Sequence, residues 1–219
     1  MSQKIKVLLV DDHSLVREGL VNLINQQPDL EVGGEATGEA QALELVATLK
    51  PDVAVVDLSL ETGSGIELLK NIKAGHPAVK TLVLSMHDES LYAERALHAG
   101  ARGYIMKREA AKKVIAGIRA VCAGQLFVSD KVSAQLAEKF AGGRKGSPGS
   151  PVEVLSDREL QVFELLGQGL TTRQIADHLH VGFKTVQAYN ARIKEKLQLT
   201  NATELMREAI RWHESKQQT

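Results

Sequence analysis

Charged and hydroxyl side chains stand where several short apolar runs of this chain end. Asp11 and Asp12 directly follow the first run, and Asp57 ends the third. Ser85 ends the fourth run, and Lys107 follows the fifth. Carboxylates that gather in one place repel one another, and a hard cation such as Mg²⁺ relieves that repulsion. One carboxylate could then attack a phosphoryl group, with Lys107 neutralising its oxygens and Ser85 donating a hydrogen bond.

The apolar runs alternate with longer stretches in which apolar residues recur at helical spacing. The runs cover residues 5–10, 30–36, 53–57, 81–85 and 103–106. Strands that alternate with helices predict an α/β fold in which a five-stranded parallel sheet is doubly wound, with helices on both faces. Ligands of such sheets bind outside the carboxyl ends of the strands, so the polar residues are expected together at one edge.

Each polar residue also has a purely structural interpretation. Asp12 could cap a helix that begins near Ser14, and Ser85 could bond its own turn. Lys107 taken alone is most simply a solvated surface charge. Their combination at successive strand ends favours a common site over independent coincidences.

In this order, the residues resemble the receiver domain of bacterial two-component response regulators, a flavodoxin-like fold, across residues 4–124. The resemblance implies that Asp57 is the phosphoacceptor, and that Asp11 and Asp12 hold Mg²⁺ with it. It further implies that Ser85 is the switch hydroxyl and that Lys107 contacts the acyl phosphate. The partner of such a domain is a sensor histidine kinase.

Two further positions acquire a role from the resemblance. The backbone carbonyl of Ser59 is expected on Mg²⁺, and Tyr104 is expected to move with Ser85 as an aromatic switch. A phosphoryl group adds about 1.5 to 2 negative charges, which would shift the domain between two pre-existing states. Glu61 and Arg108 stand where many receivers carry proline, so the loops there are expected to differ.

The composition changes before the last third of the chain. Residues 142–151 are rich in Gly, Ser and Pro and lack an apolar anchor, which predicts a flexible linker. Residues 131–141 before it have the spacing of a short connecting helix. We therefore expect a phosphoacceptor domain at 1–125, a connecting helix and linker at 126–153, and a second domain at 154–219.

The second domain has no strand pattern. Helices are expected at residues 157–167, 172–179, 183–197 and 202–212, which makes it small and all-α. The second and third form a helix-turn-helix whose polar outer face can enter a DNA major groove. Between Arg173 and Gln198, five basic side chains outnumber two acidic ones, but nine of each balance from Pro151 onward. Charge alone is therefore weak support for DNA binding.

The spacing of this segment closely resembles the LuxR-type helix-turn-helix. The matching residues are Leu155 to Glu159, Gly169, Ile175, Ala176, Leu179, Lys184 to Val186, Ile193, Lys196 and Leu197. With the receiver, the chain resembles a NarL/FixJ-type response regulator over nearly its whole length. The resemblance implies a recognition helix at 184–196. It places Gln187, Ala188 and Ala191 at base edges and Lys184, Thr185, Arg192 and Lys196 near phosphates.

Two positions of the second domain leave alternatives open. Tyr189 replaces a common histidine and could either stack on DNA or pack on the neighbouring helix. The apolar residues of 202–212 could pair two output domains, giving a homodimer that reads two half-sites, or belong to the domain core. Gly182 replaces the serine that usually caps the recognition helix.

The 27 basic and 27 acidic side chains of the 219 residues cancel, so bulk charge indicates neither nucleic acid nor an anionic membrane. A single cysteine, Cys122, allows no disulfide framework and no zinc motif, which suits a reducing cytosol, and its thiol is expected to act as a small buried hydrophobe. No window approaches the roughly 20 apolar residues that a membrane span needs. We expect a cytoplasmic protein that is neither secreted nor bound to a membrane.

The preferred hypothesis is a DNA-binding transcriptional regulator, not an enzyme, whose partner kinase loads Asp57. It is expected to form a homodimer when phosphorylated or bound to promoter DNA. The alternatives are a metal-dependent phosphatase or phosphotransferase with an aspartyl-phosphate, and a regulator that works unphosphorylated through protein contacts. The linker permits both occlusion of the DNA-binding domain at rest and dimerisation through the receiver. The sequence does not choose between them.

Overall fold

The computed structural model describes residues 4–60, 62–141 and 154–217. The chain folds as two compact units, Met1–Ala141 and Gly142–Thr219. The predicted linker at 142–151 and the unusual residue Glu61 lie outside the described residues. The domain limits of 1–125, 126–153 and 154–219 remain predictions.

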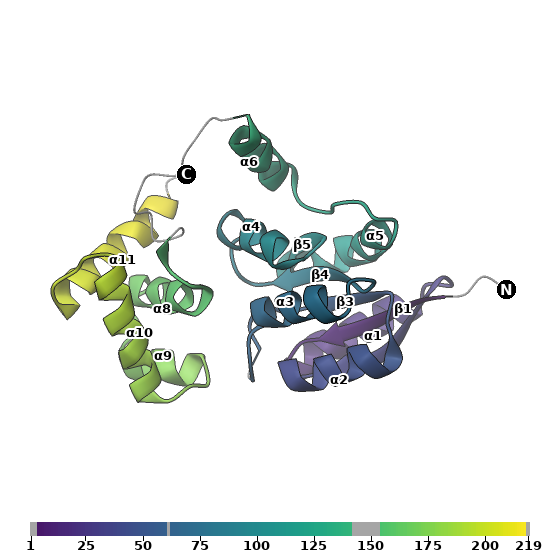
Figure 1. Cartoon of the computed structure of the whole chain (residues 1–219), viewed down its shortest axis with the longest axis horizontal. Helices are drawn as coiled ribbons and strands as arrows, with labels where there is room; N and C mark the ends of the chain where they lie inside the picture. The colour runs from purple at the N-terminus through teal and green to yellow at the C-terminus, as the bar shows by residue number, and fades with distance from the viewer. Residues whose placement is uncertain (1–3, 61, 142–153, 218–219) are drawn as a thin grey trace. The chain divides into compact units, whose positions relative to one another are not determined.

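A parallel sheet forms the centre of the first unit, as the alternating pattern predicts. Its strands are β1 (Ile5–Val10), β2 (Leu30–Ala36), β3 (Val53–Val56), β4 (Lys80–Ser85) and β5 (Gly103–Met106). They lie in the order β2-β1-β3-β4-β5, and all neighbouring pairs are parallel (Figure 1). Every residue of β3 is buried, which is typical of a strand covered on both faces. The predicted fold class is confirmed.

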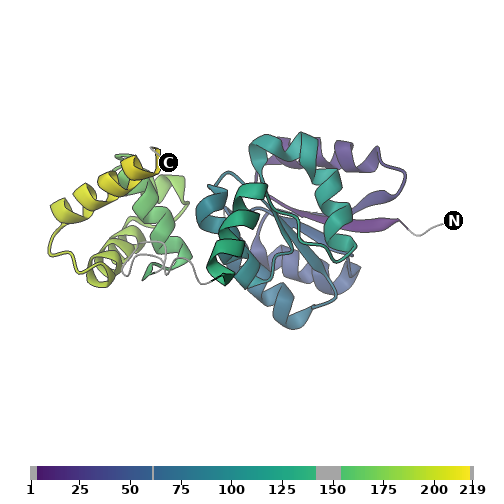
Figure 2. The ribbon, with the colours of Figure 1, turned by 90° about the horizontal axis from the view of Figure 1, so that it is seen from above.

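Helices cover both faces of the sheet. They are α1 (Ser14–Asn25), α2 (Glu39–Leu49), α3 (Gly65–Gly75), α4 (Glu89–Ala99) and α5 (Ala110–Cys122). The apolar stripes of α1 and α5 share one core with β1, β3, β4 and β5, whereas α2, α3 and α4 contact one another along the chain (Figure 2).

The segment after α5 stays with the first unit. Phe127 pairs with the edge of β5, since its carbonyl accepts from the Tyr104 amide at 2.8 Å and its amide donates to the Arg102 carbonyl at 2.9 Å. Helix α6 (Asp130–Phe140) then packs on α4. Val132 of α6 is buried, and Lys139 pairs with Glu94 of α4. The expected connecting helix therefore lies against the fourth helix of the first unit.

The second unit is helical in its described part, as predicted. Its helices are α8 (Asp157–Gly167), α9 (Thr172–His178), α10 (Phe183–Lys196) and α11 (Ala202–Gln217). Capping boxes begin α8 and α9, at Ser156 and Thr171. Helix α11 extends to Gln217, beyond the expected end at Trp212, because Glu214, Lys216 and Gln217 are good helix formers although they supply no apolar signal.

The described residues contain neither a membrane-spanning helix nor a readily ionised thiol. No helix among them is both long and apolar enough to cross a membrane. Cys122 is half-buried in α5, and burial raises the pKa of its thiol to about 11. A thiol with such a raised pKa is a poor source of thiolate at neutral pH.

Candidate phosphoacceptor pocket and nucleic-acid interface

Lys107 joins two buried carboxylates at the carboxyl edge of the sheet. Its Nζ lies 2.6 Å from Asp57 Oδ2 and 2.7 Å from Asp11 Oδ2. The three side chains are only 8%, 2% and 4% exposed, respectively. They come from the ends of β5, β3 and β1, which the parallel topology brings to one edge. The structure thus places these predicted residues together.

The burial of this group changes its protonation. Burial raises the pKa of the Asp57 carboxyl to about 6, while the charge of Lys107 opposes that rise. Burial lowers the pKa of the Lys107 ammonium, but the charges of Asp57 and Asp11 outweigh it and leave the pKa raised. Lys107 therefore stays protonated and positively charged. Its charge compensates the negative charge of the Asp57 carboxylate only in part.

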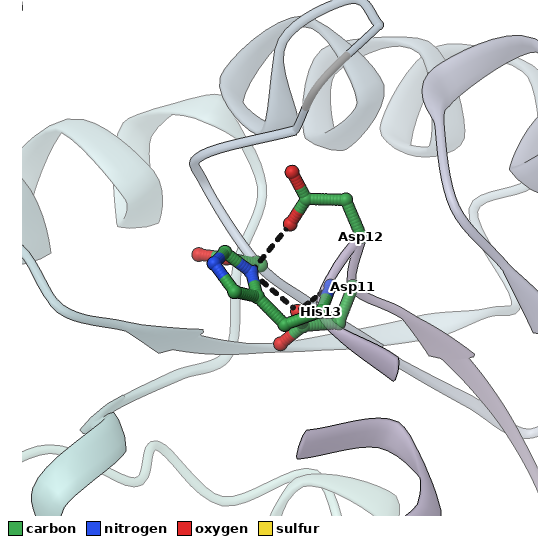
Figure 3. A group of neighbouring side chains, drawn as sticks. Asp11, Asp12 and His13 are labelled. Carbon is green, nitrogen blue, oxygen red and sulfur yellow. Dashed lines mark hydrogen bonds and ion pairs between the residues drawn. The ribbon is translucent and has the colours of Figure 1, made fainter. Parts of the chain in front are cut away.

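Asp12 and His13 extend the group toward solvent. One ligand atom each from Asp11, Asp12, His13 and Asp57 lies within 4.8 Å of the others. Figure 3 shows the His13 ring between the two neighbouring carboxylates, with Nδ1 2.7 Å from Asp12 Oδ1 and 3.3 Å from Asp11 Oδ1. Asp11 Oδ2 and Asp12 Oδ1 are buried, and they face Lys107 Nζ and His13 Nδ1 as ion pairs rather than as regular hydrogen bonds. The oxygen-rich set fits Mg²⁺.

The predicted switch residues meet at His87, which sequence reasoning missed. The amide of His87 donates to Ser85 Oγ at 3.1 Å, and its carbonyl accepts from the Tyr104 hydroxyl at 2.8 Å. Its Nε2 lies 2.8 Å from Ser59 Oγ. The Ser59 amide in turn donates to Asp57 Oδ1 at 3.2 Å. Ser85 and Tyr104 are both buried. A change at the pocket can thus reach the loop before α4 through one residue.

The loops around the pocket follow from local sequence. At Gly65, which begins α3, an added Cβ would lie 2.2 Å from the Asp57 carbonyl oxygen, so only glycine permits this approach. Lys107, Arg108 and Glu109 form a short 3-10 helix that leads into α5. Arg108, the second departure from the usual receiver pattern, therefore stands in a regular turn.

Helices α9 and α10 form the predicted helix-turn-helix. Val186 and Ile193 of α10 are fully buried, as is Ile175 of α9. The seven residues predicted to face DNA are all exposed: Lys184, Thr185, Gln187, Ala188, Ala191, Arg192 and Lys196. Tyr189 is half-buried, and Gly182 caps α10 without a side-chain hydrogen bond. As far as the second unit itself is concerned, the outer face of α10 is thus exposed and open to a partner.

Lys196 has an additional contact that the sequence did not reveal. Its Nζ lies 2.7 Å from Glu159 Oε2, and that same oxygen accepts from the Ser156 amide at 2.8 Å. Glu159 is only 3% exposed. Burial raises the pKa of Glu159, but the hydrogen bonds from Lys196 and Ser156 outweigh it and hold the pKa below its ordinary value of 4.5. Lys196 therefore ties α10 to the start of α8.

The apolar residues of α11 divide between the core and the surface. Leu205 and Ala209 are buried, and the Trp212 ring packs on Phe163 of α8 with centroids 5.3 Å apart. Ile210 is 37% exposed. The core alternative thus holds for most of these residues, while Ile210 lies at the surface and pairing of two output domains stays a prediction.

Comparisons with known proteins match both units of the chain. The family described as "Response regulator receiver domain" matches residues 7–119, and "Bacterial regulatory proteins, luxR family" matches residues 153–209. The chain is 34% identical over 210 residues to the oxygen regulatory protein NreC of Staphylococcus carnosus, covering 94% of this chain and 97% of NreC. It is 36% identical over 200 residues to the DNA-binding transcriptional activator DevR/DosR of Mycobacterium tuberculosis, covering 91% of each.

A solved structure is similar over both units. RcsB of Salmonella enterica serovar Typhimurium, bound to promoter P1flhDC in the presence of the phosphomimetic BeF3−, is 25% identical with a TM-score of 0.62. The match covers 94% of this chain and 98% of that one.

Proposed function

Because the chain belongs to the response regulators that join a receiver domain to a LuxR-type DNA-binding domain, we propose that phosphorylation of Asp57 controls its binding to promoter DNA. The observation that carries the proposal is the Lys107 ammonium, held between the buried carboxylates of Asp57 and Asp11. A phosphoryl group on Asp57 would find a fixed positive charge beside it.

The reaction is a transfer from a phosphorylated histidine of a sensor kinase. An Asp57 carboxylate oxygen forms the new P–O bond while the P–N bond breaks, and the electron pair of that bond leaves with the imidazole. Lys107 neutralises charge on the phosphoryl oxygens, and the Ser85 hydroxyl donates a hydrogen bond to one of them. Mg²⁺ held by Asp11, Asp12, Asp57 and the Ser59 backbone carbonyl would supply further charge neutralisation when bound.

The switch follows from the contacts of His87. Ser85 Oγ accepts the His87 amide in this structure, so a hydroxyl drawn toward the phosphoryl group gives up that contact. The hydrogen bond from Tyr104 to the His87 carbonyl then loses its fixed partner. His87 directly precedes the loop into α4, and α6 packs on α4. A movement of His87 is therefore transmitted toward the end of the first unit. Phosphorylation thereby shifts a population between two arrangements.

The output is DNA binding through α10. Gln187, Ala188 and Ala191 face base edges, where glutamine pairs with adenine and alanine contacts a thymine methyl group. Lys184, Thr185 and Arg192 contact phosphates. Lys196 also contacts a phosphate, while its ammonium stays paired with Glu159. RcsB has been solved as dimers bound to DNA, and we propose a homodimer that reads two half-sites for this chain as well.

The proposed role is regulatory rather than enzymatic, because one relative is named an oxygen regulatory protein and another a DNA-binding transcriptional activator. Labelling of the full chain by acetyl phosphate with Mg²⁺, followed by intact mass, tests the acceptor. Wild type should gain one phosphoryl group, and Asp57→Asn should gain none. Asp52→Asn at the opposite end of β3 is the matched control and should label normally. Equal labelling of Asp57→Asn and wild type would contradict the assignment.

A further inference from the structure

Phe183 is a large apolar side chain that the fold of its own unit leaves exposed. It is the first residue of α10 and is 48% exposed, whereas the helix contributes Val186 and Ile193 to the core with no exposure. An exposed aromatic ring at this position gives the isolated domain little stabilisation. Its exposure instead makes half of its apolar surface available to a partner.

The position of Phe183 on α10 connects it to the proposed base-reading residues. Gln187 lies four residues later, so the two side chains stand one turn apart on neighbouring positions of the helix surface. Lys184 and Thr185 directly follow Phe183 and are exposed. Gly182 before it carries no side chain, and a Cβ there would meet only Thr185 Oγ1, at 3.6 Å. The Phe183 side chain itself is 48% exposed, so part of the ring can meet a partner.

We propose that Phe183 contacts the 5-methyl group of a thymine in the major groove, next to the base pair that Gln187 reads. This inference rests on the proposed function. The N-terminal residues of a recognition helix are the ones that approach base edges. The thymine methyl is the apolar group that base edges present there, and a phenylalanine ring can neither donate nor accept a conventional hydrogen bond. Phe183 therefore selects thymine over cytosine, beside the adenine preferred by Gln187.

Uracil in place of thymine tests this contact, because the two bases differ only by the methyl group. A binding sequence is first selected from a randomised duplex library with the full-length wild-type chain, phosphodonor and a fixed salt concentration. That duplex is then made with each thymine replaced singly by uracil. Loss of one methyl contact should weaken wild-type binding roughly three- to tenfold at one position of each half-site.

Variants assign the effect to the ring. Phe183→Ala should bind the thymine and uracil duplexes equally, whereas Phe183→Leu should keep part of the discrimination. Leu126→Ala, which removes an exposed apolar side chain of similar exposure (47%) from the first unit, should leave the ratio unchanged. The inference is overturned if wild type tolerates uracil at every position or if Phe183→Ala retains the discrimination. Failure of wild type to select any sequence would instead overturn the proposed function itself.

Discussion

The Nζ of Lys107 lies 2.6 Å from Oδ2 of Asp57, so the proposed phosphoacceptor is already paired with the cation expected to hold its phosphoryl group. This pair is buried, and a second carboxylate, Asp11, shares the same ammonium. Loss of Lys107 would leave two buried acids without their common counter-charge. The stability and the charge of the pocket therefore depend on this one ammonium.

We expect Lys107→Met to lower the free energy of unfolding by about 3 kcal/mol in metal-free buffer, because it strands buried carboxylates. Adding Asp57→Asn to that variant should restore part of the loss, since one of the stranded charges disappears. Lys113→Met is the control: its ion pair with Glu109 is exposed, so the change should stay within about 0.5 kcal/mol. Urea unfolding followed by circular dichroism measures all three, and strictly additive effects would argue against a shared pocket.

Mg²⁺ should raise the midpoint of thermal unfolding of the wild-type chain, because a ligand of the folded state stabilises it by mass action. The Asp12→Asn variant should lose most of that shift, since it removes a charged oxygen ligand near Asp11 and Asp57. Asp52→Asn serves as the matched control and should respond like wild type. Calorimetry with increasing MgCl₂ provides the measurement, and an undiminished shift in Asp12→Asn would remove that residue from the site.

Tyr104→Phe deletes the hydroxyl that donates to the His87 carbonyl and nothing else of the ring. The variant should lose about 1 kcal/mol of stability and still be labelled on Asp57, because the hydroxyl is not part of the acceptor chemistry. Its gain in DNA affinity on phosphorylation should be smaller than that of wild type. Fluorescence anisotropy with labelled duplex compares the two chains, and an unchanged gain would exclude this hydrogen bond from the switch.

The low pKa of Glu159 predicts an acid-sensitive second unit. A carboxyl whose pKa is lower in the folded chain stabilises the fold fully above its ordinary value of 4.5 and loses that contribution as the pH falls below it. Glu159→Gln should reduce stability at pH 7 and flatten the pH dependence between about pH 5 and 3. Trp212, the one tryptophan of the chain, reports unfolding of this unit by fluorescence.

Glu195 is exposed, so Glu195→Gln is the matched control for the acid unfolding of Glu159→Gln. It should leave both the stability at pH 7 and the acid response close to those of wild type. Identical acid responses of Glu159→Gln and wild type would show that the ion pair with Lys196 contributes nothing to the pH dependence.

The sequence predicted what local periodicity and strand ends can encode. The carboxyl ends of β1, β3 and β5 indicated where Asp11, Asp57 and Lys107 would meet, since parallel topology fixes one edge for all of them. The exposed face of α10 could likewise be predicted, because Val186 and Ile193 are apolar and lie on the opposite, buried side of the helix.

The residues that were missed depend on contacts between distant segments. His87 touches Ser59 from another strand end, and Glu159 reaches Lys196 across two helices. A polar side chain in a loop or a capping box has an ordinary local interpretation, so no periodic pattern reveals such a partner. His13 was the exception that could have been found, because it directly follows Asp12 in the sequence.

The most direct test of the account is the affinity of the full chain for its selected duplex, measured with and without acetyl phosphate and Mg²⁺ at one stated salt concentration. Phosphorylated wild type should bind roughly 5- to 150-fold more tightly than the untreated chain, the range that typical coupling free energies allow. Asp57→Asn should show no such gain. Equal affinity of wild type with and without phosphodonor, despite complete labelling of Asp57, would contradict the claim that this pocket controls DNA binding.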